Sequence, residues 1–404
     1  MINRVKLFIL LAVCSLLLIS TKLFYSADHI PIDADTINRY IPLKKAAVLG
    51  DYHQKPEANE KETTAYESES PSTRVNAAFV ALVRNSELAG LRSTVRQIED
   101  RFNRKYKYPY IFLNDVPFTE EFKRGMSFVT DNEIRYGMLN ASDWSIPKHL
   151  DPAKVFAALE KNKSRYIYGG SLSYRYMCRF QSGLFYDHPL LKDLEYYWRI
   201  EPDVNYYCDL DYDPFVFMKE NGKRYSFTIA PLEWEKTVET LWPTTLTWIK
   251  ENPHHLPEES MINWVMGNNG DYNMCHFWSN FEIVDLSLYR SEAYRSYFDH
   301  LDKSGGFFYE RWGDAPIHSI AASMFLKKSE IHWFEDIGYK HPGNEHCPRP
   351  EEMALKCVCD SSRSYTYRSR CQRRFSLVQD VKKEELLQKV AQRLIDVPPA
   401  SPQP

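Results

Sequence analysis

Acidic residues are dense in one short stretch near the middle of the chain. Tyr196–Asp213 reads YYWRIEPDVNYYCDLDYD, in which five carboxylates are interleaved with aromatic side chains. Carboxylates at this density repel one another unless a cation or a polar ligand lies among them. The stretch contains two overlapping D-x-D pairs between Asp209 and Asp213 and an E-x-D variant that begins at Glu201. Such pairs can hold a divalent metal for a phosphorylated sugar donor. The alternative is a buried, tyrosine-rich segment with acids at its surface.

A second candidate carboxylate is Glu282, in the segment SNFEIVD. Phe281 and Ile283 flank it, so on a strand Glu282 points away from both of them and towards a cleft. A sugar transfer that retains configuration needs a carboxylate or another electron-rich group on the sugar face opposite the leaving group. The alternative is a buried glutamate in a structural ion pair.

Two histidines and three arginines carry further chemistry. His341 lies in the Gly- and Pro-containing loop DIGYKHPGNEHCP, and His318 follows the segment WGDAPI. Imidazole together with carboxylate suits Mn²⁺ with positions left open for phosphate. The guanidinium groups that could bind phosphate or a base belong to Arg84, Arg179 and Arg311. We prefer Arg84, because it directly follows the first predicted strand.

Plausible sugar contacts are Tyr174 and the tripeptide Trp312-Gly313-Asp314, with core packing as their alternative role. Two sequons, at Asn140 and Asn162, are candidate sites of N-glycosylation. The net charge of −3 gives no indication of a nucleic-acid partner.

Alternating strand and helix patterns after Val75 predict a parallel α/β sheet. The predicted order is strand 76–83, helix 87–102, strand 110–113, helix 120–129 and strand 134–138. Ligands of such sheets bind at the carboxyl ends of the strands. Arg84 follows the first strand and Asn114 the second, so both are expected at that edge. Neither strand precedes a GxGxxG or P-loop motif, which argues against a standard dinucleotide or ATP site.

Weaker patterns predict the remaining elements. We expect helices over 151–163, 171–186, 188–198, 233–251, 286–301, 315–327 and 381–396. A hairpin of strands 215–220 and 225–230 is expected around Asn221-Gly222. Short extended segments are expected at 280–284 and 331–334.

The N-terminal region predicts a membrane anchor followed by a stem. Residues 1–6 hold Arg4 and Lys6, which predict a cytoplasmic tail, and residues 7–25 form an apolar run that suits a transmembrane signal anchor. A cleaved signal peptide is the alternative. Residues 26–74 predict a flexible stem, 75–348 a luminal catalytic domain, and 349–404 a C-terminal extension with an amphipathic helix.

Seven cysteines follow the apolar run that contains Cys14. In a secretory compartment most of them should form disulfides, and an odd number leaves one free or intermolecular. A zinc site is the alternative for five residues near the C-terminus, although their spacing fits no usual zinc pattern. These residues are His346, Cys347, Cys357, Cys359 and Cys371.

Seven longer motifs occur in order between about Val75 and Pro348. They are YPYIFLNDVPF, YGMLNASDWSIP, YRYMCRFQSGLFY, WRIEPDVNYYCDLDYDPF, CHFWSNFEI, YERWGDAPIHSIAASMFL and FEDIGYKHP. Together they resemble the fungal Golgi α-1,2-mannosyltransferase family, the Kre/Ktr/Mnt group, whose anchor and stem the N-terminal region also matches.

The resemblance implies a GT-A-like nucleotide-sugar-binding α/β fold with a mixed central sheet flanked by helices. It also implies a single-pass type II protein of the Golgi membrane with its catalytic domain in the lumen. The implied reaction is a retaining, Mn²⁺-dependent transfer of mannose from GDP-mannose to a mannose hydroxyl of N- or O-linked glycans, most often in α-1,2 linkage.

The resemblance also assigns roles to individual residues. Glu282 matches the position proposed as nucleophile, although a front-face displacement would leave it an electrostatic role. Glu201 and His341 match metal ligands, which moves the expected metal away from the D-x-D pairs. The positions near donor or acceptor are Arg84, Tyr174 and Asp314. Alternative activities are mannosylphosphate transfer, glycoside hydrolysis, and glycan binding or regulation without turnover.

Overall fold

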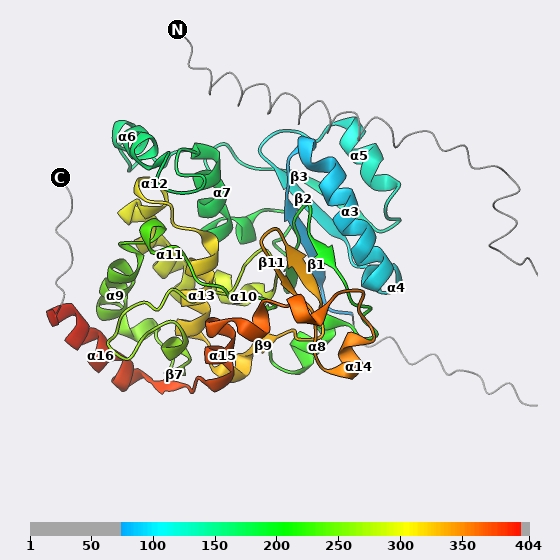
Figure 1. Ribbon diagram of the computed structural model, residues 1–404. Helices are drawn as coiled ribbons and strands as arrows, with labels where there is room; N and C mark the ends of the chain where they lie inside the picture. The colour runs from blue at the N-terminus through cyan, green and yellow to red at the C-terminus, as the bar shows by residue number, and fades with distance from the viewer. Residues whose placement is uncertain (1–73, 397–404) are drawn as a thin grey trace, which may run out of the picture. The chain divides into compact units, whose positions relative to one another are not determined.

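A seven-stranded mixed sheet forms the centre of the computed structural model, which describes residues 74–396 (Figure 1). The strand order is β3-β2-β1-β4-β8-β6-β9. Strand β8 is antiparallel to both neighbours, and the other pairings are parallel. The strands are β1 (Ala77–Leu82), β2 (Tyr110–Asn114), β3 (Ile134–Met138), β4 (Tyr196–Arg199), β6 (Tyr225–Phe227), β8 (Glu282–Asp285) and β9 (Ile331–Trp333). The predicted mixed α/β sheet is therefore confirmed.

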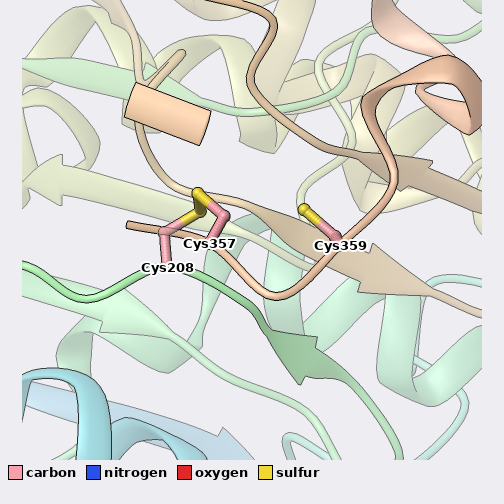
Figure 2. Close-up of side chains that lie close together, drawn as sticks. All are labelled: Cys208, Cys357 and Cys359. Atoms are coloured by element: carbon pink, nitrogen blue, oxygen red, sulfur yellow. A yellow bond between two sulfur atoms is a disulfide. The ribbon is translucent and has the colours of Figure 1, made fainter. Parts of the chain in front are cut away.

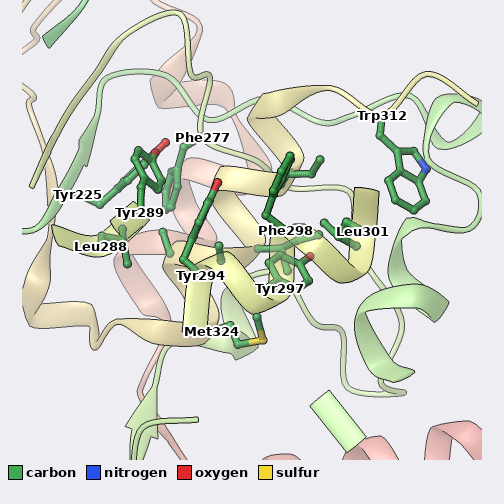
Figure 3. Packing of buried hydrophobic residues seen from close by; sticks show 14 of the residues in the cluster. Tyr225, Phe277, Leu288, Tyr289, Tyr294, Tyr297, Phe298, Leu301, Trp312 and Met324 are labelled. Carbon is green, nitrogen blue, oxygen red and sulfur yellow. The ribbon is translucent and has the colours of Figure 1, made fainter. Parts of the chain in front are cut away.

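Both faces of the sheet are covered, which explains why β1 reads as an unbroken apolar run, AAFVAL. Its side chains alternate between two hydrophobic clusters, with Phe79 in one and Ala78 and Val80 in the other. The Phe79 face packs against α3 (Leu88–Ile98), α5 (Glu120–Ser127) and α8 (Pro214–Glu220). The opposite face packs against helices that include α7 (Leu172–Gly183), α11 (Glu292–Ser304) and α13 (Asp314–Phe325). Figure 3 shows aromatic members of this second cluster, among them Tyr289 and Tyr294.

The helices begin where the sequence supplies caps. Asp151 accepts a hydrogen bond from the Ala153 amide at the start of α6, and Ser171 and Ser291 cap α7 and α11 in the same way. The longer helices are α3 (Leu88–Ile98), α5 (Glu120–Ser127), α6 (Pro152–Asn162), α7 (Leu172–Gly183), α8 (Pro214–Glu220), α9 (Leu241–Glu251), α11 (Glu292–Ser304), α13 (Asp314–Phe325), α15 (Arg370–Leu377) and α16 (Lys383–Asp396).

Two predicted elements are wrong. The expected helix 188–198 consists instead of turns followed by β4, whose four residues are all buried between β1 and β8. Tyr196-Tyr197-Trp198 suits a buried strand better than a helix, because aromatic residues pack well on a sheet. The expected strand 215–220 is helix α8, because Pro214 occupies its first turn and Asp213 accepts from the Phe215 and Val216 amides. Strand β6, the second half of that predicted hairpin, is real but shorter.

A second, three-stranded sheet includes part of the acidic stretch Tyr196–Asp213. It joins β5 (Asn205–Tyr206), β10 (Tyr339–His341) and β11 (Asn344–His346) in the order β11-β10-β5. Two disulfides tie the region together, Cys208–Cys357 and Cys347–Cys359. His341 is therefore held at the end of a paired strand, and not in the free loop that its sequence suggests.

The expected extension after Pro348 packs against the rest of the described chain. Disulfide Cys275–Cys371 joins α15 to the segment before β8, and Arg393 on α16 pairs with Asp271. The predicted amphipathic helix is confirmed, with Leu386 and Val390 buried. Within residues 74–396, no helix has the length and apolarity needed to cross a membrane. The predicted tail, anchor and most of the stem lie outside the described residues.

Candidate active site

Two adjoining cavities open at the carboxyl edge of the parallel strands. The first has a volume of about 310 Å³ and the second of about 430 Å³. Five residues line both: Tyr168, Tyr174, Met177, Arg199 and Glu201. The location agrees with the rule that open α/β sheets bind ligands beyond their strand ends.

The first cavity gathers the residues that follow three neighbouring strands. Arg84 follows β1, Asn114 ends β2 and Glu201 follows β4, as the strand pattern predicts for the first two. The Arg84 guanidinium donates to Ser173 Oγ at 2.5 Å. The Asn114 side chain is buried, and its Nδ2 has no hydrogen-bond partner within residues 74–396. Because an unsatisfied buried donor costs about 1–3 kcal/mol, this amide suits a ligand that supplies an acceptor.

Arg199, the last residue of β4, lines both cavities and binds two carboxylates. Its guanidinium donates to Glu201 Oε1 at 2.5 Å and to Asp314 Oδ2 at 2.5 Å. Asp314 also accepts from Ser279 Oγ at 2.7 Å. Burial alone would raise the pKa of Asp314, but the charge of Arg199, together with the contributions of His318 and of the hydrogen bonds from Ser279 and Arg199, lowers it below its ordinary value. The network fixes both carboxylates in their ionised form.

Glu201 and His341 come together although they lie far apart in the sequence. Nε2 of His341 lies 3.4 Å from Oε2 of Glu201. Nδ1 of His341 lies 3.2 Å from the Pro342 carbonyl oxygen, which can only accept, so Nδ1 carries a proton and Nε2 is the ring atom that faces Glu201. Burial raises the pKa of Glu201, but Arg199 and then His341 lower it to about 2. A carboxylate oxygen and an imidazole nitrogen that face each other are the atoms that one shared cation could bind.

Glu282 lies beneath the cavities and is fully buried. Its carboxylate accepts hydrogen bonds from the hydroxyl groups of three tyrosines, which are Tyr197, Tyr225 and Tyr289. His318 Nδ1 lies 3.1 Å from the same carboxylate, and its Nε2 lies 3.0 Å from the Gln181 carbonyl oxygen. In the described part of the chain, Glu282 lines neither of the two cavities. The sequence-based expectation that it faces a cleft is therefore not met in this structure, although its catalytic role stays a prediction.

Tyr174 stands between the two cavities. Its hydroxyl accepts from Arg311 at 3.2 Å, and its ring stacks on Tyr168 with 4.5 Å between centroids. Tyr168 has a backbone φ of 60°, a conformation that non-glycine residues rarely adopt and that is concentrated at functional sites. The structure thus brings together five of the six residues that sequence predicted for catalysis, metal and substrate, namely Arg84, Tyr174, Glu201, Asp314 and His341.

The D-x-D carboxylates lie elsewhere and have protein partners. Asp209 pairs with Arg101 at 2.5 Å, and Asp211 pairs with Lys356 at 2.6 Å. Asp213 caps α8 and accepts from the Tyr108 hydroxyl. These contacts support the structural interpretation of the three aspartates over a metal site.

Two of the other candidate side chains also have structural roles. Arg179 forms a two-bond pair with Asp302, at 2.7 and 2.9 Å. Trp312 is fully buried in the core and donates to Glu310. Arg311, in contrast, lines the second cavity.

The cysteines form disulfides and not a zinc site. Cys208, Cys357 and Cys359 gather within 4.8 Å of one another (Figure 2). Cys357 is bonded to Cys208 and Cys359 to Cys347, so none of these sulfurs is a thiolate. His346 donates and accepts within the protein, between Thr366 and Glu335. As expected from the odd number, one cysteine of the described chain remains free, the buried Cys178.

The two sequons differ in accessibility. Asn140 is exposed. Asn162 is 3% exposed, and its amide donates to the Tyr309 carbonyl at 3.3 Å. The structure therefore favours Asn140 as the carrier of a glycan.

Sequence reasoning missed Arg199, Ser279 and Trp278, all of which line the second cavity. Trp278 contacts the ring of His341 at 4.7 Å between centroids. The one signal for Arg199 was a charged residue at the end of an aromatic run, two positions before Glu201. Ser279 and Trp278 carried none beyond their closeness to Glu282 in the chain.

Comparison with known proteins shows which family the chain belongs to. Residues 34–380 match the family described as glycolipid 2-alpha-mannosyltransferase. The protein of that name from Saccharomyces cerevisiae is 50% identical over 294 residues, which cover 72% of this chain and 66% of that protein. The chain thus spans about two thirds of the length of this relative.

Two solved structures share the fold. The mannosyltransferase Ktr4p from S. cerevisiae, in complex with GDP, has a TM-score of 0.73 and 37% identity, over 78% of this chain and 84% of that one. Core-mannan synthase A from Aspergillus fumigatus, in a form with Mn and GDP, has a TM-score of 0.69 and 36% identity, over 86% of this chain and 93% of that one. From the family match and these relatives, the chain belongs to the glycolipid 2-alpha-mannosyltransferase family.

Proposed function

We propose that this protein is a metal-dependent, retaining mannosyltransferase that moves mannose from GDP-mannose to a mannose hydroxyl of protein-linked glycans, in α-1,2 linkage. The observation that carries the proposal is the Glu201–His341 pair at the junction of two cavities, with its carboxylate fixed by Arg199. Family membership and the resemblance to Ktr4p with GDP support the choice of donor.

The two cavities suit the two substrates. The first cavity, with Arg84 and the unpartnered amide of Asn114, suits the guanosine diphosphate part of the donor. The second cavity, with Tyr174 and Asp314, suits the acceptor mannose. Because Tyr174, Arg199 and Glu201 line both, the donor sugar and the acceptor hydroxyl would meet there.

Glu201 and His341 fit a manganese site, since carboxylate oxygen and imidazole nitrogen are ligands that Mn²⁺ accepts. They leave most of its coordination positions to water and to the donor phosphates. A bound Mn²⁺ would offset the negative charge that the departing diphosphate develops. Core-mannan synthase A in its Mn and GDP form supports this choice of metal. The role of Arg199 is to keep Glu201 ionised and in place.

For Glu282 we propose the electrostatic role that a front-face displacement requires. Three tyrosine hydroxyls and His318 already surround its carboxylate, so an attack on the anomeric carbon would need those bonds to be broken. Glu282 on β8 lies directly opposite Arg199 on β4, because the two residues are register partners in these neighbouring strands. Glu282 would therefore stabilise positive charge from beneath the site without contacting the sugar.

We also propose the Golgi membrane as the site of action, with residues 7–25 as a type II anchor and residues 75–348 as the luminal catalytic domain. The apolar run, the preceding basic residues and the three disulfides support this placement. Proteolysis of intact Golgi vesicles tests it: the body should be protected until detergent is added. Digestion without detergent would overturn the orientation.

The activity is tested by release of GDP from GDP-mannose with and without methyl α-mannoside. We expect release that depends on the acceptor, stops in EDTA and returns with Mn²⁺. Release that is independent of acceptor would indicate hydrolysis, release of GMP would indicate mannosylphosphate transfer, and an unchanged rate in EDTA would overturn the metal requirement. Binding of GDP-mannose without release of either nucleotide would favour a glycan-binding protein.

A further inference from the structure

The second cavity has exposed apolar side chains that the proposed transfer to one mannose does not use. They come from two segments far apart in the sequence, Ile167-Tyr168 and Leu232–Trp234. Tyr168 is 57% exposed and Trp234 is 55% exposed. Within residues 74–396, the Trp234 indole makes no ring contact and donates no hydrogen bond, so its packing does not explain its position.

Unpartnered polar groups occur in the same cavity. His276 is 5% exposed, and its Nδ1 has no hydrogen-bond partner within the described chain. The same holds for Nε of Arg311, whose guanidinium lies 3.7 Å from Glu233. Buried polar atoms without partners are costly, and hydroxyl-rich ligands can satisfy both donors and acceptors.

This combination has the chemistry of a carbohydrate site. A pyranose has an apolar face of C–H groups that packs on an aromatic ring, and hydroxyls at its edge that bond to charged or amide groups. The second cavity, with about 430 Å³, is also larger than the first, with about 310 Å³. This is the opposite of what the proposed ligands require, since the nucleotide in the first cavity is bigger than one mannose in the second. The room exceeds what one acceptor mannose requires.

We propose that the exposed part of the second cavity is a subsite for the second mannose ring of the acceptor glycan, with Trp234 as its stacking surface and His276 and Arg311 as its polar contacts. This inference rests on the proposed function. It assigns the protein a preference for acceptors that already end in two mannoses. A nucleotide base is the less suitable occupant, because Trp234 lines the second cavity and not the first, which we assign to the nucleotide.

The position of the reactive groups supports this order of the two rings. Glu201, Asp314 and His341 line the same cavity, and they are about one quarter exposed or less. The ring that receives mannose must reach these buried groups. The ring that precedes it in the glycan is therefore left with the more exposed surface that Leu232 and Trp234 provide.

The test compares methyl α-mannoside with methyl α-1,2-mannobioside as acceptors for the full chain. We expect the KM for the disaccharide to be about tenfold lower in the natural protein, as one stacked ring warrants. Trp234→Ala should raise the disaccharide KM about tenfold. It should leave the KM for methyl α-mannoside and for GDP-mannose within about twofold. Trp234→Phe should keep most of the preference.

The control is Phe128→Ala, which removes an aromatic ring that is 74% exposed and lies outside both cavities. It should change neither KM. Equal KM values for the two acceptors in the natural protein would overturn the subsite, and so would a Trp234→Ala variant that weakens both acceptors or GDP-mannose equally.

A measurement without turnover separates this inference from the proposed function. Saturation-transfer NMR of methyl α-1,2-mannobioside with GDP present should show contact from both rings, and Trp234→Ala should remove the contact from the ring that carries the methyl group. If neither acceptor is turned over but this contact is lost, the subsite stands and the proposed activity fails. Contact from one ring alone would overturn the subsite.

Discussion

Oε2 of Glu201 lies 3.4 Å from Nε2 of His341, so that a carboxylate and an imidazole meet in the second cavity. The separation is longer than a good hydrogen bond. The contact joins Glu201, two positions after β4, to the end of β10, and pairing of β10 with β5 and β11 holds the imidazole there. The folded chain thus brings the two proposed metal ligands together from the ends of strands in two different sheets.

Removal of either ligand should weaken the binding of Mn²⁺. Glu201→Gln and His341→Ala should each lower Mn²⁺ affinity by a factor of about 10–100, measured as free Mn²⁺ by electron paramagnetic resonance in the presence of GDP. His254→Ala is a matched control, because His254 is exposed and lines neither cavity. Normal affinity in both site variants would place the cation elsewhere.

Stability should fall in acid partly through Glu201. The pKa of Glu201 is about 2 in the folded protein against an ordinary value of 4.5. Its ionised form therefore stabilises the fold above pH 4.5, and this contribution, roughly 3 kcal/mol, is lost as the pH falls towards 2. The lowered pKa of Asp314 acts in the same direction.

Urea unfolding at a series of pH values checks this expectation without added metal. The gap in unfolding free energy between the natural protein and Glu201→Gln should narrow as the pH falls from 4.5 towards 2. A gap that stays constant over this range would mean that the carboxylate is not stabilised by its ionised neighbours.

Arg199 should prove essential for the fold of the site. Its buried guanidinium neutralises two carboxylates, so Arg199→Met leaves Glu201 and Asp314 without their cation. Loss of one partner of such a buried network costs about 3–5 kcal/mol. Chemical denaturation should detect this loss, and Arg199→Lys should recover part of it, since lysine keeps the charge but not the two-pronged geometry. A cost below about 1 kcal/mol would show that solvent already screens the network.

Glu282 variants separate attack from electrostatic support. Glu282→Ala should lower kcat by a factor of about 10²–10³ through the lost charge. Added azide should not restore turnover, because azide can replace a missing nucleophile only where it reaches the anomeric carbon, and Glu282 lies outside the cavity lining of the described chain. Formation of β-mannosyl azide would instead assign Glu282 the nucleophilic role.

Cys178 should be unreactive in the native protein. Burial raises the pKa of its thiol to about 12, so almost no thiolate is present at neutral pH. Iodoacetamide should leave a Cys14→Ser variant unlabelled until it is denatured, when one site per chain reacts. Rapid labelling of Cys178 in the native state would contradict its burial.

The strand pattern was enough to predict the cavity edge. Arg84 and Asn114 follow two apolar runs, and parallel pairing of β1 with β2 brings both into the first cavity. The antiparallel β8 was not predictable from local pattern, because its register with β4 depends on long-range packing. That register is what sets Glu282 opposite Arg199 and beneath the cavities.

Ion-pair partners from distant segments determine which carboxylates remain available to a ligand. The local sequence around a carboxylate does not show these partners. Asp209 and Asp211 form the more familiar metal motif, yet Arg101 and Lys356 occupy them from distant segments. Resemblance to relatives was therefore needed to select Glu201 and His341. The helix predicted for 188–198 was wrong for a related reason, since burial between two neighbouring strands, which the local sequence does not contain, decides the structure of β4.

The product of GDP-mannose and methyl α-mannoside, made in the presence of Mn²⁺ and analysed by NMR, tests the central claim most directly. Retaining transfer predicts a disaccharide in which an α-mannosyl unit is linked to O2 of the acceptor, with one GDP released for each linkage. A β-linked disaccharide, a phosphodiester with release of GMP, or free mannose alone would contradict it.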